Sequence, residues 1–231
     1  MSNNGFFAKF LRWSGIVLMG LTAGFTLLGG AGTSCVAFNP AGFGESMAKL
    51  APFQWLYILF VLSGIALGLY GIHATILLVK GSDKAYREAL IVLVAGVVIG
   101  ALHIVVSRAL RGKSMPVDGV VYATVLTLII FLLFRIPAIW QAVNFSRGSA
   151  SANRPAGGAA AIMLGLFTLT IQFSMGATHT WNGVNYADAF NATMTAVGAA
   201  CLLFGAALLF RRPRLPRFAL LRKPLARKPV Q

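Results

Sequence analysis

Long apolar runs separated by short polar segments make up most of this chain. We predict six such runs, at about residues 14–32, 53–79, 88–107, 119–140, 157–176 and 190–210. Each approaches or exceeds the roughly 20 residues that cross about 30 Å of hydrocarbon as a helix. Their apolar residues are continuous rather than alternating, which favours helices over barrel strands. The pattern predicts an all-α polytopic membrane protein, a bundle of six transmembrane helices over residues 1–210.

Positive charge alternates between the two predicted sides of the membrane. With both termini inside, 16 Lys and Arg residues lie on the inner side, from Lys9 to the tail. The outer side has only Lys49, Arg108, Arg111 and Lys113. The positive-inside rule therefore predicts cytoplasmic termini, with residues 211–231 as a basic, proline-containing cytoplasmic tail. From this charge pattern we expect the protein in the plasma (inner) membrane of a bacterium.

Composition agrees with a bundle embedded in lipid. The 231 residues are 58% hydrophobic and only 11% charged, with a mean hydropathy of +0.78, whereas soluble domains carry about 25% charged residues. The net charge of +15 is explained by topology and tail. It has no accompanying nucleic-acid motif, so we expect no nucleic-acid partner.

The first apolar run also resembles a secretory signal, because Lys9 and Arg12 precede it. Gly32 stands where a lipoprotein motif ending at Cys35 needs a branched apolar residue, so we expect the run to persist as the first helix. Cys201 is expected at a different membrane depth from Cys35, which predicts no disulfide between them.

Small residues spaced by four mark the helix faces expected to pack closely. Such pairs occur in every predicted helix except the fourth: Gly20 and Gly24, Gly64 and Gly68, Gly96 and Gly100, Ala161 and Gly165, Cys201 and Gly205. Large side chains fill helix four. We therefore predict that helix four is the most exposed to lipid, or that it meets a partner subunit.

Two basic groups are candidates for lipid or partner binding. Arg108, Arg111 and Lys113 break the charge rule on the predicted outer side, where they could anchor headgroups or dock an acidic partner. A local error in the predicted topology is the third interpretation. The tail contributes Arg211, Arg212, Arg214 and Arg217, which would attract anionic lipid or lie across a partner.

His73 and His103 are the intramembrane candidates for binding a cofactor. Predicted helices two and three run in opposite directions, which separates the two imidazoles by some 18 Å in depth at 1.5 Å per residue. They could not share a haem. Either could ligate a haem or chlorophyll singly, although a hydrogen-bonded structural histidine is the favoured interpretation, and no cofactor is expected.

An outer polar cluster of His179, Asn185 and Asp188 is the remaining candidate site. These residues lack metal-ligand spacing, so no metal is predicted. All five acidic residues of the chain fall in loops or at helix ends, which argues against a proton or cation pathway.

Three functions stay open at this point. The favoured one is a non-catalytic integral subunit that anchors or scaffolds a larger membrane complex, with lipids and other membrane subunits as partners. A small transporter or channel for a neutral or anionic solute is the second. The third is a haem- or pigment-binding redox subunit. A membrane enzyme using His179 and Asp188 is weaker still.

Overall fold

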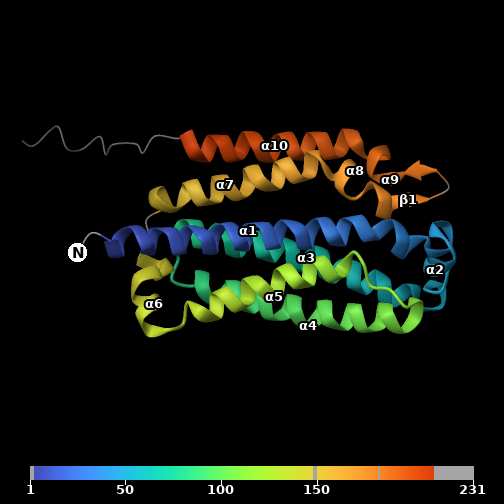
Figure 1. Cartoon of the computed structure of the whole chain (residues 1–231), viewed down its shortest axis with the longest axis horizontal. Helices are drawn as coiled ribbons and strands as arrows, with labels where there is room; N and C mark the ends of the chain where they lie inside the picture. The colour runs from blue at the N-terminus through green and yellow to red at the C-terminus, as the bar shows by residue number, and fades with distance from the viewer. Residues whose placement is uncertain (1–2, 148–149, 182, 211–231) are drawn as a thin grey trace, which may run out of the picture.

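A computed structural model describes residues 3–147, 150–181 and 183–210 of the chain. The described chain is an all-α bundle whose successive long helices run antiparallel (Figure 1). The long helices are α1 (Asn3–Phe38), α3 (Gln54–Lys80), α4 (Ala85–Arg111), α5 (Val117–Leu133), α7 (Ala150–Leu169) and α10 (Asn191–Phe210). Residues 3 and 210 lie at the same end of the bundle, here called the N-terminal end (Figure 1).

Short elements close both ends of the bundle. The N-terminal end has α6 (Pro137–Val143) and the 3₁₀ turn η3 (Phe145–Arg147). The opposite end, here called the hairpin end, has η1 (Pro40–Phe43), α2 (Glu45–Ala48), η2 (Ala51–Phe53), α8 (Ile171–Ser174), η4 (Gly176–His179), β1 (Thr180–Trp181), β2 (Val184–Asn185) and α9 (Tyr186–Ala189). The two strands form an antiparallel hairpin in which Thr180 is paired with Asn185.

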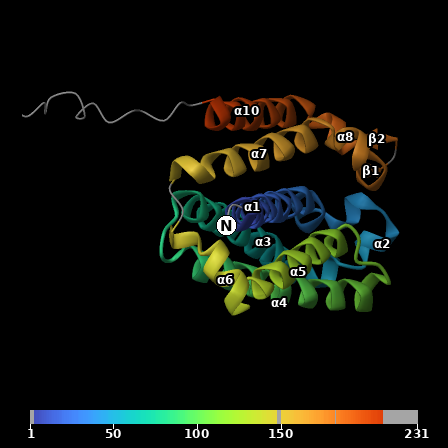
Figure 2. The same cartoon turned by 60° about the vertical axis from the view of Figure 1, so that its left-hand side comes forward.

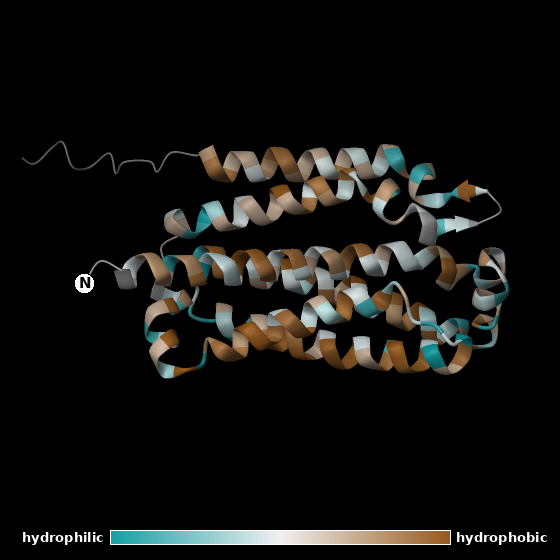
Figure 3. Cartoon of the chain, viewed as in Figure 1, coloured by the Kyte–Doolittle hydropathy of each residue, from teal (hydrophilic) through white to brown (hydrophobic). Residues whose placement is uncertain are grey.

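Several helices are long and apolar enough to cross a membrane. Four meet this requirement alone, namely the helices within Gly5–Phe38, Ala51–Lys80, Ala85–Arg111 and Asn191–Phe210, and the bent pair α5–α6 would make a fifth. Figure 3 shows hydrophobic residues along the helices and hydrophilic residues mainly toward the two ends of the bundle. The length of α7 is sufficient, but its first turns contain Asn153, Arg154 and Pro155.

The predicted continuous helix over 119–140 is wrong. α5 ends at Leu133, and α6 is turned from it by 98°. Pro137 is the first residue of α6, and Ile136 before it has an extended ψ of 126°. A proline disfavours the helical conformation at the preceding residue and cannot donate a backbone hydrogen bond. Continuous hydropathy concealed this break.

Two other helices also differ from their predicted bounds. α1 begins at Asn3 and is 36 residues long, because helix formation does not require the apolar composition that marked 14–32. The fifth predicted helix, 157–176, begins earlier and is broken. α7 ends at Leu169, and the short α8 follows a turn at Thr170.

The predicted small-residue faces are confirmed as close helix contacts. In the α1–α3 pair, a Cβ on Gly68 would lie 2.7 Å from the Cα of Leu27. In the α7–α10 pair, a Cβ on Gly165 would lie 2.8 Å from the carbonyl oxygen of Gly198. A Cβ on Gly100 of α4 would lie 2.4 Å from Val121 of α5. These glycines let helix backbones approach where lipid provides no hydrophobic drive to associate.

α1 is the central helix, and α10 is the peripheral one (Figure 1, Figure 2). α1 packs against α3, α5 and α7, whereas the long-helix neighbour of α10 is α7. The prediction that helix four is the most exposed is wrong. α5 buries Asp118, Val121, Thr124, Thr127 and Phe131, but α10 buries only Gly198 and Gly205. The packed face of α5 carries the polar residues Thr124 and Thr127. The search for small residues spaced by four therefore did not identify it as a helix-packing face.

Candidate functional site

Arg108 of the outer basic group is bonded to Ser114 and Asp118 at the hairpin end. Its Nη2 donates to Asp118 Oδ1 at 2.9 Å, and its Nε donates to Ser114 Oγ at 2.9 Å. The Ser114 hydroxyl in turn lies 2.7 Å from Asp118 Oδ2. The three side chains close a ring in which the carboxylate compensates the arginine charge.

Local chain geometry brings these residues together. Gly112, with φ of +70°, ends α4 in the left-handed conformation that glycine adopts without strain. Asp118 lies in the first turn of α5, where the exposed backbone N–H groups and the helix dipole favour an acidic side chain. The side chain of Asp118 is only 7% exposed, whereas that of Arg108 is 56% exposed.

Arg111 is also directed toward the chain itself, and Lys113 is not. Arg111 Nη2 donates to the Met115 carbonyl at 2.9 Å, and its Nη1 lies 3.3 Å from the sulfur of Met47. Its Nε is buried without a hydrogen-bond partner among the described residues. Lys113 is exposed. The structure therefore separates the predicted basic group into two arginines with internal contacts and one outward lysine.

His103 is packed among aromatic rings of α3. It stacks on Phe60 with ring centroids 4.3 Å apart, and it meets Tyr57 edge-on at 5.3 Å. The Tyr57 hydroxyl is 2.6 Å from that of Ser107, so α3 and α4 share a buried polar contact one turn beyond His103. This imidazole therefore contributes to the packing of α3 against α4.

His73 has the opposite environment, on the outer surface of α3 near the N-terminal end. It is exposed, and its ring stacks beside Tyr70 at 6.3 Å. The Tyr70 hydroxyl donates to the carboxylate of Glu88, which also accepts from Arg87 Nη2 at 2.8 Å. The structure does not bring His73 and His103 together, because they lie in opposite halves of the bundle.

The outer-loop residues form a small cap above the ends of α7 and α10. Asn185 Oδ1 accepts from the backbone N–H groups of Ala187 and Asp188, and thereby caps α9. His179 Nδ1 lies 2.9 Å from the Met175 carbonyl oxygen. Asp188 is exposed. Asn185 thus has a structural role in this cap, and His179 has a backbone partner.

Metal-ligating side chains do not gather anywhere in the described chain. No group of three His, Cys, Asp or Glu side chains in its described ranges could hold a metal ion. Cys35 and Cys201 are both free thiols, which confirms that they do not pair.

The N-terminal end is held by side-chain bonds to the backbone. Arg12 donates to the carbonyls of Val143 and Asn144, at 2.9 and 3.1 Å, and so ties α1 to the end of α6. Arg135 lies over the rings of Tyr86 and Trp140, each at 5.8 Å. These contacts stabilise the corner where α5 turns into α6.

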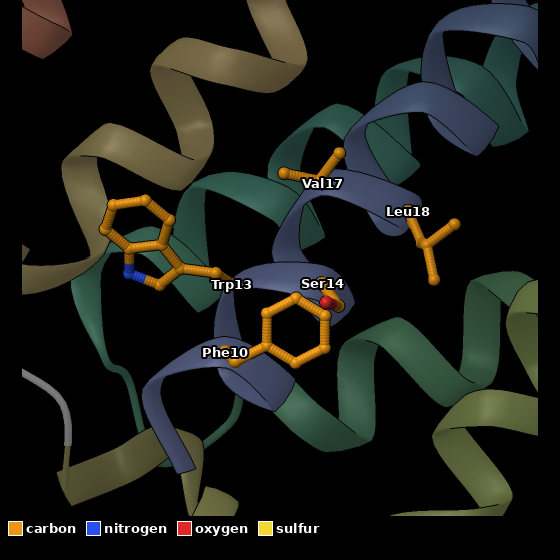
Figure 4. A pocket seen from close by; sticks show the side chains of 5 residues that line it. All are labelled: Phe10, Trp13, Ser14, Val17 and Leu18. Carbon is orange, nitrogen blue, oxygen red and sulfur yellow. The ribbon is translucent and has the colours of Figure 1, made fainter. Parts of the chain in front are cut away.

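A shallow hollow lies on the outer surface of α1, near the N-terminal end (Figure 4). Its lining side chains all come from this helix: Phe10, Trp13, Ser14, Val17 and Leu18. Trp13 Nε1 donates to the Ala152 carbonyl of α7 at 3.2 Å. Only Ser14 and the indole N–H offer polar groups, and the N–H is already bonded. The surface of the hollow is apolar.

Two polar contacts in the bundle interior were missed by the sequence analysis. The hydroxyls of Thr22 and Thr127 are 2.8 Å apart and buried between α1 and α5. Asn153 donates to the Leu78 carbonyl at 3.2 Å, and its Oδ1 is buried without a partner in the described chain. In the sequence, these polar residues stand at helical spacing from small residues. A search for apolar runs does not detect this pattern.

The predicted tail residues Arg211, Arg212, Arg214 and Arg217 lie outside the described residues. Comparisons of the chain with models of known protein families, with curated proteins and with solved structures find no match.

Proposed function

We propose that this chain is a six-span membrane protein with both termini in the cytoplasm, which serves as a non-catalytic subunit anchoring or scaffolding a larger membrane complex. The common location of both described ends supports an even number of crossings (Figure 1). α7 is the fifth of the six spans in this proposal. Its polar first turns would lie at the cytoplasmic interface, where Arg154 can reach the headgroups.

The observation that carries the proposal is the use of reactive side chains for internal contacts. Asp118, Glu88 and Arg12, which could bind a solute or move a proton, are bonded to neighbouring parts of the chain. The glycine seams pack the helices directly on one another. Such an arrangement favours a rigid, non-catalytic membrane element.

The peripheral helix α10 offers the face on which a partner would dock. Its second half exposes large apolar side chains, with Leu203 73% exposed and Phe204 61% exposed. One side of α10 is already fixed by the glycines facing α7. The other side is free to meet a transmembrane helix of another subunit.

Purification from native membranes tests the proposal. We expect the tagged chain, solubilised in mild detergent, to elute as an assembly larger than its 24.5 kDa mass, with a stoichiometric second protein identified by mass spectrometry. Leu203→Ala combined with Phe204→Ala should reduce that protein. Val98→Ala combined with Leu102→Ala, on the exposed face of α4, is the matched control. A monomer with no protein companion would overturn the proposal.

A further inference from the structure

The outward face of α3 is apolar along its length except toward one end. Its exposed side chains recur at spacings of four and three residues, as Trp55, Leu59, Leu62, Ala66, Leu69, His73, Ile76 and Lys80. His73 is the single polar residue of this stripe between Trp55 and Lys80. An exposed imidazole within a lipid-facing stripe is costly unless another molecule satisfies it.

Positive charge gathers beside the same end of the stripe. Lys80 and Lys84 are exposed, and neither has an ion pair in the described part of the chain. The side chain of Arg87 is 68% exposed, whereas its partner Glu88 is only 13% exposed. Tyr70 and Arg87 together occupy both oxygens of that carboxylate. Asp83 is also exposed in this loop, so the three basic residues outweigh Asp83 and Glu88 by one charge and leave the corner with a net charge of +1.

The spacing of these groups matches the layout of a phospholipid. Lys80 follows His73 by seven residues, which is about 10 Å along a helix. Continuing away from Lys80, the stripe beyond His73 is wholly apolar for about five turns, through Leu69 and Leu62. A transmembrane partner helix would present apolar side chains along its whole length. A phospholipid instead carries its charge at one end, as this face does.

We propose that the outward face of α3 binds an anionic phospholipid at the N-terminal end of the bundle. Lys80 and Arg87 hold the phosphate, and the His73 imidazole donates to an ester carbonyl below it. One acyl chain lies along Leu69 and Leu62. Basic residues near an anionic leaflet attract its lipids at about 1 kcal/mol each. The inference rests on membrane insertion and is independent of membership in a complex.

Native mass spectrometry of the purified full chain tests this site. The detergent-solubilised protein is titrated with phosphatidylglycerol and, separately, with phosphatidylcholine. We expect wild-type protein to retain phosphatidylglycerol preferentially. Lys80→Gln should weaken that retention about five-fold, and His73→Leu should lower the retention of both lipids. Lys113→Gln, an exposed lysine at the hairpin end, is the matched control and should change nothing.

Two outcomes would overturn the lipid site. One is equal retention of the two lipids by the wild type. The other is phosphatidylglycerol retention in Lys80→Gln and His73→Leu that equals the control, with unfolding temperatures showing that all variants are folded. If His73→Leu releases a co-purifying protein instead, the stripe is a protein interface. Because lipid and protein masses are read separately, this result is distinct from failure of the complex.

Discussion

Asp118 shows how a single carboxylate can determine the role of the basic residues near it. It accepts hydrogen bonds from both Arg108 and Ser114, and its side chain is only 7% exposed. Sequence alone grouped Arg108 with Arg111 and Lys113, because they are adjacent and share a sign. It could not show that the turn after Gly112 returns Asp118 to Arg108, because that depends on the path of the loop.

We predict that Asp118→Asn destabilises the protein by about 1–2 kcal/mol. The substitution leaves Arg108 without its counter-charge, a loss that is reduced here because the guanidinium is half exposed. The unfolding temperature in detergent should fall by a few degrees. Asp188→Asn removes an exposed carboxylate and serves as control. A pair of equal unfolding temperatures would show that the Arg108–Asp118 bond contributes nothing.

Hydropathy located the long helices well and their ends less well. α3, α4 and α10 lie within a few residues of their predicted bounds, because lipid-length apolar runs define them. The turn at Pro137 and the break at Thr170 were missed, since both lie within apolar sequence. The candidate site was less predictable than the helices, because Tyr70 meets Glu88 through tertiary packing of α3 against α4.

At the α7–α10 contact, we predict that Gly165→Leu forces the two helices apart. A Cβ at this position would lie 2.8 Å from the Gly198 carbonyl oxygen and 3.1 Å from Cys201, so the backbone must move. Overpacking of this kind costs about 1–3 kcal/mol, read as a lower unfolding temperature. Gly119→Leu is the control, because nothing lies within 4 Å of a Cβ there. Equal effects of the two would argue against a close seam.

For the whole molecule, the six-span arrangement predicts which loops face outside. In a background of Cys35→Ser and Cys201→Ser, Lys113→Cys should react with an impermeant maleimide on intact cells. Lys84→Cys, in the exposed loop at the other end of the bundle, should react only after permeabilisation. Labelling of both positions from the same side would contradict the topology, and the reversed pattern would invert the orientation.

The central location of α1 has a consequence for biosynthesis. α3 packs on α1, α4 on α3, α5 on both α4 and α1, α7 on α1, and α10 on α7. Each long helix after α1 thus packs on at least one helix that the ribosome has already completed. The bundle can therefore assemble in the order of translation, with α10 added last, where it completes the most extensive contact of α7.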